Sequence, residues 1–311
     1  MDNLNTLKND LESTKELKKI ISTMKTLAMA NIKIYEKIVF NLLKYQSNVD
    51  LGLQAILNQR PEAIDYIDYV RGPHENEKTG TSRKAIALII GSNQGLCGKF
   101  NDRVVDFFLG NVKSQGNDYI VTVGNRVNTL ASAKQIRVDR HFSMPGSKKQ
   151  LIWFVYELFN MIEMILDNGE LAKVTLYFTN YSARGLGSLT RRRVLPLDRK
   201  NFDRLREKKW PTNNIPCWRL DSRKLVSGFI QQYMFTSIYM ALANSLASEQ
   251  MSRIETLHGA EQNIRSRLDE ITLKINQTRQ NTITTELLDM LSGTKLLLYG
   301  SPQRNSYHSG T

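Results

Sequence analysis

The sequence predicts an α/β domain carried between two long helical arms. Near the C-terminus, apolar residues recur at alternating intervals of three and four, which is typical of a helix seam; they are Ile254, Leu257, Ile264, Leu268, Ile271 and Ile275. A similar repeat opens the chain. Between the arms, short apolar runs alternate with amphipathic stretches, which favours a mostly parallel sheet with helices on its faces.

The first helical arm is predicted over residues 1–70. Asp2 or Asn3 can cap its first turn, and the chain has no glycine before Gly52 and no proline before Pro61. Its apolar stripe consists of Leu4, Leu7, Leu11, Leu17, Ile21, Met24, Ala28, Ile32, Tyr35, Val39 and Leu42. Residues 71–83 are polar and contain glycine, proline and serine, so we expect an exposed linker there.

Residues 84–220 are predicted to form the central domain. The run 84–90 is almost entirely apolar and ends at Gly91, as expected of a strand buried on both faces. Further strands are predicted at 119–123, 135–138 and 173–179, and helices at 101–112, 124–132 and 148–166. The basic stretch that follows contains three prolines, which favours strand and loop over helix.

The second helical arm is predicted over residues 221–300, with a flexible tail at 301–311. Gly259 costs about 1 kcal/mol relative to alanine, which packing of the arm can offset. Two arms of this length must bury their apolar stripes against each other or against a partner.

Composition restricts the class of protein. The chain has 311 residues, a hydrophobic fraction of 41% and a formal net charge of +13. No apolar stretch reaches the roughly 20 residues of a membrane span, and the acidic N-terminus is unlike a signal or transit peptide. Cys97 and Cys217 match no zinc or redox spacing. We therefore expect a soluble protein in a reducing cytoplasm, with no metal site and no cofactor.

The positive charge is concentrated between Ser182 and Lys224, a segment that contains 13 Lys and Arg but only 4 Asp and Glu. This segment includes the run Arg191, Arg192 and Arg193. Nucleic acid, acidic protein surface and anionic lipid headgroups are all possible partners of such a segment. A solvated basic loop is the alternative.

The glycine-rich loop at residues 91–99 lies between a predicted strand and a predicted helix. It lacks the spacing of a phosphate-binding loop and of a dinucleotide fingerprint. We therefore interpret it as a tight connection that needs several glycines. Cys97 has no neighbouring histidine to act as a base, so we expect a small buried side chain rather than a nucleophile. The sequence offers no other catalytic set.

Polar residues are set among the seam positions of the second arm, notably Arg253, Arg279, Gln280 and Thr284. Asn and Gln are poor choices for a helix that is only solvated. Such residues can form directional hydrogen bonds to a surrounding protein. The alternative is that they only fix the register of a coiled coil.

Several stretches resemble the gamma subunit of F-type ATP synthases. They are Ile21–Ala28 (ISTMKTLA), Gly91–Asn101 (GSNQGLCGKFN), Ser245–Glu249 (SLASE), Ser252–Arg253 and Thr278–Leu287 (TRQNTITTEL). The resemblance spans nearly the whole chain, in the same order of helix, α/β domain and helix. It implies that the two arms form an antiparallel coiled coil and that the Rossmann-like central domain is the foot of a stalk.

The resemblance also implies partners and a role. The chain would be a non-catalytic rotor subunit that couples ion-driven ring rotation to conformational change in catalytic beta subunits. It would contact alpha and beta subunits, an epsilon subunit and a ring of c subunits, at the cytoplasmic face of a prokaryotic membrane reached only through the complex. Met24, Lys25, Arg253, Gln280 and Thr284, accompanied by Arg279, match residues that face beta. We place Arg191, Arg192 and Arg193 at the foot, against the membrane ring or epsilon.

The chain departs from the family pattern at Asn93 and at Thr256–Ala260 (TLHGA), where the family usually reads Ala-Met-x-Asn-Ala. Asn93 replaces the acid that usually follows the serine of the glycine-rich loop. The stretch Lys25–Lys37 resembles the divergent N-ATPase branch, which is often linked to sodium transport. The rival function is a basic coiled-coil protein that binds nucleic acid or serves as a scaffold.

Overall fold

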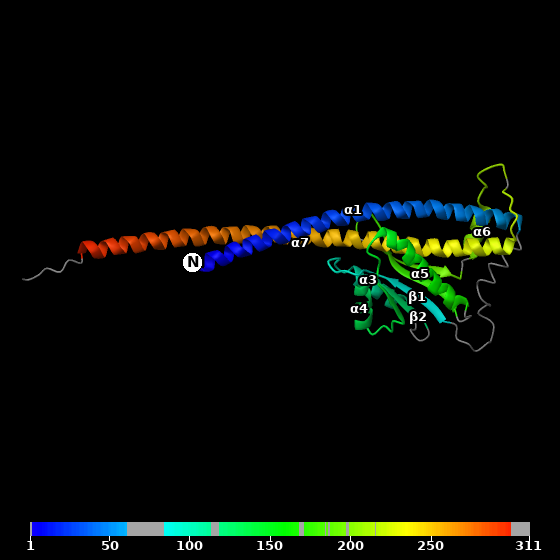
Figure 1. Ribbon diagram of the computed structural model, residues 1–311, viewed down its shortest axis with the longest axis horizontal. Helices are drawn as coiled ribbons and strands as arrows, with labels where there is room; N and C mark the ends of the chain where they lie inside the picture. Colours follow the sequence, from blue (N-terminus) through cyan, green and yellow to red (C-terminus); the bar gives the residue numbers. More distant parts are fainter. Residues whose placement is uncertain are drawn as a thin grey trace, which may run out of the picture. The chain divides into compact units, whose positions relative to one another are not determined.

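The computed structural model describes residues 2–60, 84–112, 118–167, 171–183, 185, 187–196, 199–214 and 216–299 (Figure 1). These fall into two compact units. The smaller combines residues 1–24 with 257–311, and the larger comprises 25–256. The predicted end of the first arm at 61–70, the linker at 71–83 and the tail at 301–311 lie outside the described residues.

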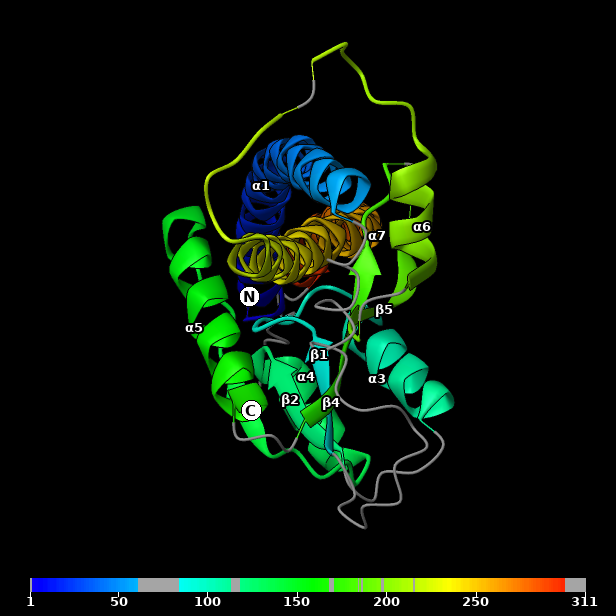
Figure 2. The same cartoon turned by 90° about the vertical axis from the view of Figure 1, so that its right-hand side faces the viewer.

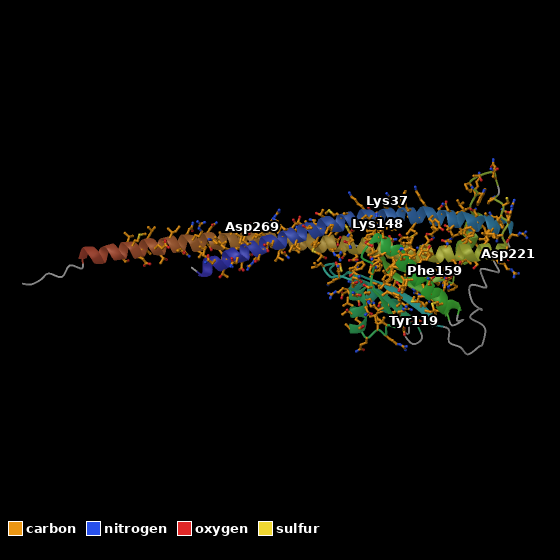
Figure 3. All side chains as sticks on the ribbon, viewed as in Figure 1. Lys37, Tyr119, Lys148, Phe159, Asp221 and Asp269 are labelled. Atoms are coloured by element: carbon orange, nitrogen blue, oxygen red, sulfur yellow. The ribbon has the colours of Figure 1, made fainter. Side chains whose placement is uncertain are left out.

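Both predicted arms are long helices. Helix α1 spans Asp2–Gln59 and helix α7 spans Ser222–Tyr299. Asp221 lies at the N-terminal end of α7 (Figure 3) and caps the helix. Its carboxylate accepts a hydrogen bond from the Arg223 N–H at 3.2 Å, and its carbonyl accepts one from the Leu225 N–H at 3.0 Å. These bonds satisfy amide groups that a helix N-terminus otherwise leaves without partners.

Within the larger unit, α1 and α7 pack side by side and antiparallel (Figure 2). Val49 and Ile56 of α1 share one buried cluster with Val226 and Ile230, near the start of α7. Farther along the pair, the Tyr45 hydroxyl donates a hydrogen bond to Gln232 Oε1 at 2.9 Å. Residues later in α1 therefore contact residues earlier in α7, so the two helices run in opposite directions.

Within the smaller unit, the predicted seam of α7 is confirmed, since Leu257, Ile271 and Ile275 are buried. The seam predicted for α1 is wrong at Leu17. Leu17 is 53% exposed, while Lys18 is half-buried. The half-buried positions 4, 7, 11, 14, 18 and 21 keep the alternating three-and-four spacing. Helix geometry thus selects Lys18, whose aliphatic stem can cover apolar surface.

The central sheet has five strands in the order β3-β2-β1-β4-β5. The strands are β1 Lys84–Ile90, β2 Tyr119–Val123, β3 Arg140–Phe142, β4 Leu171–Asn180 and β5 Ser188–Leu195. All neighbouring pairs are parallel except β4 and β5. The mostly parallel sheet predicted from the alternating pattern is confirmed.

Burial on both faces explains the apolar run of β1. Ile86, Leu88 and Ile90 join the large cluster that includes α1, α7 and α5 (Lys148–Asp167). Ala87 and Ile89 point to the opposite face, in a cluster with α3 (Phe100–Asn111) and α4 (Asn125–Ala133). With a period of two and both faces covered, every position of the strand favours an apolar side chain.

Two predictions for the central domain are wrong. The strand expected at 135–138 lies later, at β3. Gln135 turns the chain with a positive φ of 58°, and Ile136, just beyond the end of α4, donates its N–H to the Ala131 carbonyl at 3.0 Å. The basic segment also contains a helix, α6, at Arg199–Glu207. Its prolines bracket this helix instead of interrupting it.

Candidate functional site

One face of α7 in the larger unit carries small polar side chains that bond to the loops following β1 and β4. The Ser245 hydroxyl donates to the Ile90 carbonyl at 3.4 Å, and the Ser252 hydroxyl donates to the Cys97 carbonyl at 2.8 Å. The Tyr181 N–H donates to Asn244 Oδ1 at 3.4 Å. We call residues 244, 245, 248, 252 and 256 the docking face of α7.

Two glycines allow the loops to approach this face closely. A Cβ atom at Gly187 would come within 2.4 Å of Ser248 Oγ, and one at Gly98 within 2.9 Å of Thr256 Oγ1. Gly98 also has a positive φ of 55°, which other residues adopt at a cost. Within residues 91–99, contact with α7 explains Gly98, and a Cβ atom at Gly91 would come within 2.4 Å of Val127 Cβ, whereas one at Gly95 would meet nothing within 4 Å. The prediction that the loop needs its glycines therefore holds for Gly91 and Gly98 and is wrong for Gly95.

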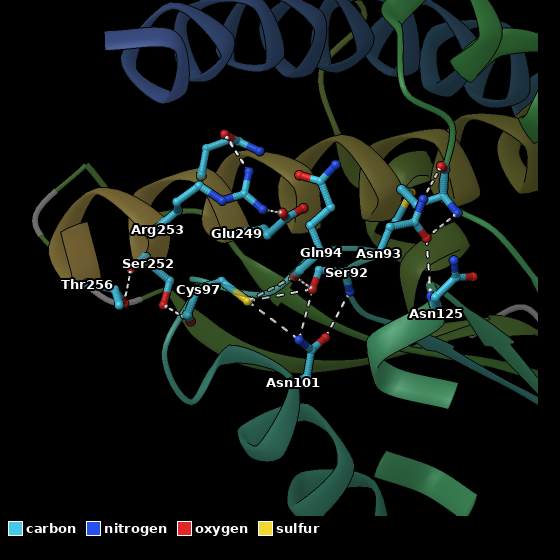
Figure 4. Close-up of polar contacts among 12 residues, drawn as sticks. Ser92, Asn93, Gln94, Cys97, Asn101, Asn125, Glu249, Ser252, Arg253 and Thr256 are labelled. Atoms are coloured by element: carbon cyan, nitrogen blue, oxygen red, sulfur yellow. Dashed lines mark hydrogen bonds and ion pairs between the residues drawn. The ribbon is translucent and has the colours of Figure 1, made fainter. Parts of the chain in front are cut away.

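A buried side-chain network orders the glycine-rich loop (Figure 4). Asn101 Oδ1 accepts a hydrogen bond from the Ser92 N–H at 2.8 Å, and Asn101 Nδ2 donates to Ser92 Oγ at 2.8 Å. The Cys97 thiol is buried beside them, and burial raises its pKa. A raised pKa leaves less of the nucleophilic thiolate, which agrees with our interpretation of Cys97 as a small buried side chain.

Asn93 connects this loop to the segment after β3. Asn93 Nδ2 donates to the Met144 carbonyl at 2.6 Å, while Asn93 Oδ1 accepts from the Met144 N–H at 2.9 Å and from the Asn125 N–H at 3.2 Å. A carboxylate could accept the two N–H bonds but could not donate to the carbonyl. The departure from the acidic residue is therefore matched by a contact that only an amide makes.

Arg253 lies inside the structure, not on an open face. It is 8% exposed, and its guanidinium bonds Glu249 Oε1 at 2.5 Å and Gln250 Oε1 at 3.2 Å (Figure 4). Burial raises the pKa of the Glu249 carboxyl, and the neighbouring Arg253 guanidinium opposes that shift. Among the described residues, Arg253 Nε has no hydrogen-bond partner.

The other residues expected to face beta lie nearer the surface. Met24 and Lys25 are half-buried on α1, whereas Arg279, Gln280 and Thr284 are exposed on α7. The Thr284 hydroxyl donates to the Gln280 carbonyl at 2.9 Å, within the same helix. Gln280 and Thr284, four residues apart, share one side of α7.

The three arginines expected at the foot lie on β5 and point in different directions. Arg191 and Arg193 are exposed, while Arg192 is half-buried and directs its guanidinium toward Met240 Sδ at 3.6 Å. A strand alternates its side chains between two faces. Arg191 and Arg193 are therefore available to a partner, and Arg192 packs against α7.

Our reading of the sequence missed the docking face and the role of Glu249. Both lie within residues 244–256, of which Ser245–Glu249 and Ser252 entered the sequence analysis only through the resemblance. Ser245, Ser248, Ser252 and Thr256 recur at three- and four-residue intervals. Small hydroxyl residues at that spacing mark a helix face that admits close contact, and this pattern could have located it.

Within the described residues, no helix is both long enough and apolar enough to span a membrane. No group of three or more His, Cys, Asp or Glu side chains that could hold a metal ion occurs in the same part of the chain. An open pocket of about 520 Å³ is lined by Asn58, Asp203, Arg206 and Glu207. Its charged lining differs from the mostly apolar walls of typical small-molecule sites.

Comparisons with known proteins agree with the resemblance in the sequence. A family model described as ATP synthase matches residues 3–297. The ATP synthase gamma chain of Rickettsia bellii is 22% identical over 300 residues, covering 95% of this chain and 99% of the relative. That of Mesoplasma florum is 24% identical over 305 residues, covering 96% and 100%.

Solved structures share the fold. A chain of the Euglena gracilis mitochondrial ATP synthase, from a structure described as OSCP/F1/c-ring, is similar with a TM-score of 0.61, at 17% identity and with 99% of both chains covered. A rotor structure from the same enzyme gives a TM-score of 0.57 at 16% identity, covering 91% of this chain and 99% of that one. From the family match over nearly its full length, together with this shared fold, the chain belongs to the ATP synthase gamma chain family.

Proposed function

We propose that this chain is the central-stalk rotor subunit of a rotary F-type ATP synthase. It would couple ion-driven rotation of a membrane ring to conformational change in catalytic beta subunits, and would itself carry out no chemistry. One observation supports this above all: in a gamma chain family member, an α/β domain is bonded to a long antiparallel helix pair through the docking face of α7. Such an arrangement can pass torque from a foot to a shaft.

The mechanism follows from an asymmetric and stiff helix pair. As the pair turns, it presents different side chains to each surrounding beta subunit, which biases the open and closed states of that subunit. Alpha and beta subunits and a c-subunit ring are the expected partners, because the related Euglena structure is described as containing F1 and c-ring. An epsilon subunit beside the foot is part of the same proposal.

We assign contact with beta subunits to Met24, Lys25, Arg279, Gln280 and Thr284. The exposure of the last three is consistent with this role. We also assign Arg253 to this contact. To bind a beta subunit, its guanidinium would have to leave the Glu249 carboxylate and bond a group of the partner instead.

The foot contact is assigned to Arg191, Arg192 and Arg193 on β5. Exposed Arg191 and Arg193 would bond the c ring or epsilon, and Arg192 would hold the strand against α7. The membrane would be reached only through the complex, at the cytoplasmic face of a prokaryotic cell membrane.

We place the chain in the N-ATPase branch because of the amino-acid sequence of Lys25–Lys37. The coupling ion, sodium or proton, would be set by other subunits. The coupling ion can be identified by measuring ATP synthesis by the assembled complex with and without a sodium gradient. Synthesis driven only by protons would argue against sodium transport.

Purification of the tagged chain from its own cells tests the rotor proposal. We expect alpha, beta, epsilon and c subunits and nucleotide-hydrolysing activity to co-purify. A nucleic-acid-binding or scaffold role is not favoured, because the family match and the relatives' names point elsewhere. Isolation with DNA or RNA, released by raising the salt concentration and without any ATPase subunit, would reverse that judgement.

A further inference from the structure

The larger unit contains a buried ion pair next to the docking face of α7. Glu249 and Arg253 each follow a docking residue, Ser248 and Ser252, by one position, which places the pair about 100° around the helix from that face. Glu249 is 5% exposed and Arg253 is 8% exposed. Figure 4 shows the pair on α7 together with Ser252, whose hydroxyl bonds the Cys97 carbonyl of the glycine-rich loop.

Charges of this pair reach two other elements. Burial is the main cause that raises the pKa of Tyr35 on α1 and of the Cys97 thiol; beyond it, the Glu249 carboxylate raises and the Arg253 guanidinium lowers the pKa of each. The pair therefore lies near both α1 and the loop that follows β1. Three parts of the fold meet around one guanidinium and one carboxylate.

Stability alone is a poor explanation for this pair. Removing two charges from water costs several kcal/mol per ion, and the attraction between them offsets that cost only when every donor is satisfied. Arg253 Nε has no hydrogen-bond partner among the described residues. A buried pair that is incompletely satisfied favours a role in fixing one arrangement of the surrounding parts.

We propose that the Glu249–Arg253 pair is a positioning element that holds residues 91–98 on α7 in a single arrangement. In that arrangement the Ser252 hydroxyl donates to the Cys97 carbonyl at 2.8 Å, and Gly98 lies so close to α7 that a Cβ atom there would come within 2.9 Å of Thr256 Oγ1. The functional part rests on the proposed rotor function: the pair keeps the α/β domain and the helix pair turning as one body.

Removing Glu249 and removing Arg253 leave different groups buried without a partner. In Glu249→Gln, the Arg253 guanidinium stays charged, because arginine does not deprotonate in proteins. In Arg253→Gln, the Glu249 carboxyl can take up a proton, which burial already favours. A charge that cannot be neutralised must reach water, and it can do so when the loop leaves α7.

Cys97 reports this opening. The chain has two cysteines, of which Cys217 is exposed and Cys97 is buried. In a Cys217→Ser background, Cys97 is the single thiol, and its rate of reaction with a thiol reagent measures how often the loop opens. We expect Glu249→Gln to raise that rate at least tenfold, since breaking a buried pair costs more than the 1.4 kcal/mol that corresponds to tenfold. Arg253→Gln should raise it less, and the double variant should return toward the parent.

Glu270→Gln is the matched control, because Glu270 forms an exposed pair with Arg267 on the same helix. It should leave the Cys97 rate unchanged. Equal rates in Glu249→Gln, Arg253→Gln and the parent would overturn the proposal. If Glu249→Gln does not fold, as judged by circular dichroism, Arg253→Gln and the double variant give the same comparison.

The functional part is tested in the assembled complex. With Glu249→Gln we expect ATP hydrolysis to continue while ion pumping per ATP falls at least twofold. Unchanged pumping despite an exposed Cys97 would limit the pair to a structural role and refute the coupling claim. Failure of the chain to assemble with an ATP-hydrolysing hexamer would instead refute the rotor function, and the thiol result would stand by itself.

Discussion

Ser252 of α7 donates its side-chain hydroxyl to the backbone carbonyl of Cys97, at 2.8 Å and across 155 positions of sequence. This bond ties the loop after the central strand of the sheet to the C-terminal arm. Ser245 makes the same kind of bond to Ile90, at the end of that strand. The α/β domain is therefore held to α7 by polar contacts as well as by apolar burial.

Ser252→Ala should lower the free energy of unfolding by about 1–2 kcal/mol, because the buried Cys97 carbonyl loses its partner. Urea unfolding followed by circular dichroism measures this. Ser266→Ala, on an exposed part of the same helix, is the control and should change stability by less than about 0.5 kcal/mol. Equal effects of the two substitutions would show that the Ser252 bond contributes nothing.

Asn93→Asp should destabilise the chain by about 1–3 kcal/mol, although the new residue is closer to the family pattern. The carboxylate would face the Met144 carbonyl, to which the Asn93 amide now donates. Asn263→Asp, exposed on α7, controls for the added charge. A stability equal to that of the parent would mean that the Met144 segment rearranges to donate to the acid.

Tyr181 should make stability fall at alkaline pH. Burial and a hydrogen bond to the Glu36 carboxylate raise the pKa of Tyr181 from 10.0 to about 12. The protonated phenol is thus favoured in the folded state, and its contribution is complete below pH 10 and lost as the pH rises toward 12. Unfolding free energies of the parent and of Tyr181→Phe should converge across this interval. A constant difference between them would contradict the shift.

The double substitution Arg191→Glu and Arg193→Glu should weaken assembly with the membrane sector while leaving the fold intact, because both side chains are exposed. Co-purification of c subunits with the tagged chain measures assembly. Lys148→Glu with Lys149→Glu makes the same change of charge at exposed positions of α5. If both double variants assemble like the parent, β5 is not the foot contact.

Gln280→Ala with Thr284→Ala should reduce ATP turnover of the assembled complex severalfold and leave stability unchanged. Loss of one or two hydrogen bonds of about 0.5–1.5 kcal/mol each to a partner accounts for that size. Gln277→Ala with Thr282→Ala changes equally exposed side chains and serves as the control. Turnover that falls equally in both would point to a general effect of the helix surface.

Much of the fold could be predicted from local pattern. The seam at Leu257, Ile271 and Ile275 and the all-apolar strand at 84–90 follow from periodicity and burial, which depend on neighbours within a few residues. Strand β3 (Arg140–Phe142) could not be placed this way. An apolar residue such as Ile136 suits both a strand and the turn that follows a helix, and only its hydrogen-bond partners distinguish the two.

Some features of the candidate site could likewise be predicted from local pattern, and others could not. Local sequence patterns were enough to predict two long helices, a mostly parallel sheet between them and a polar set on α7 that includes Gln280 and Thr284. Packing between distant segments was needed to show that Arg253 is buried with Glu249, that Lys18 replaces Leu17 in the seam and that the Ser252 hydroxyl bonds the Cys97 carbonyl. Burial of a polar residue depends on which distant segments pack over it, and neither the residue type nor its spacing along the chain shows which segments those are.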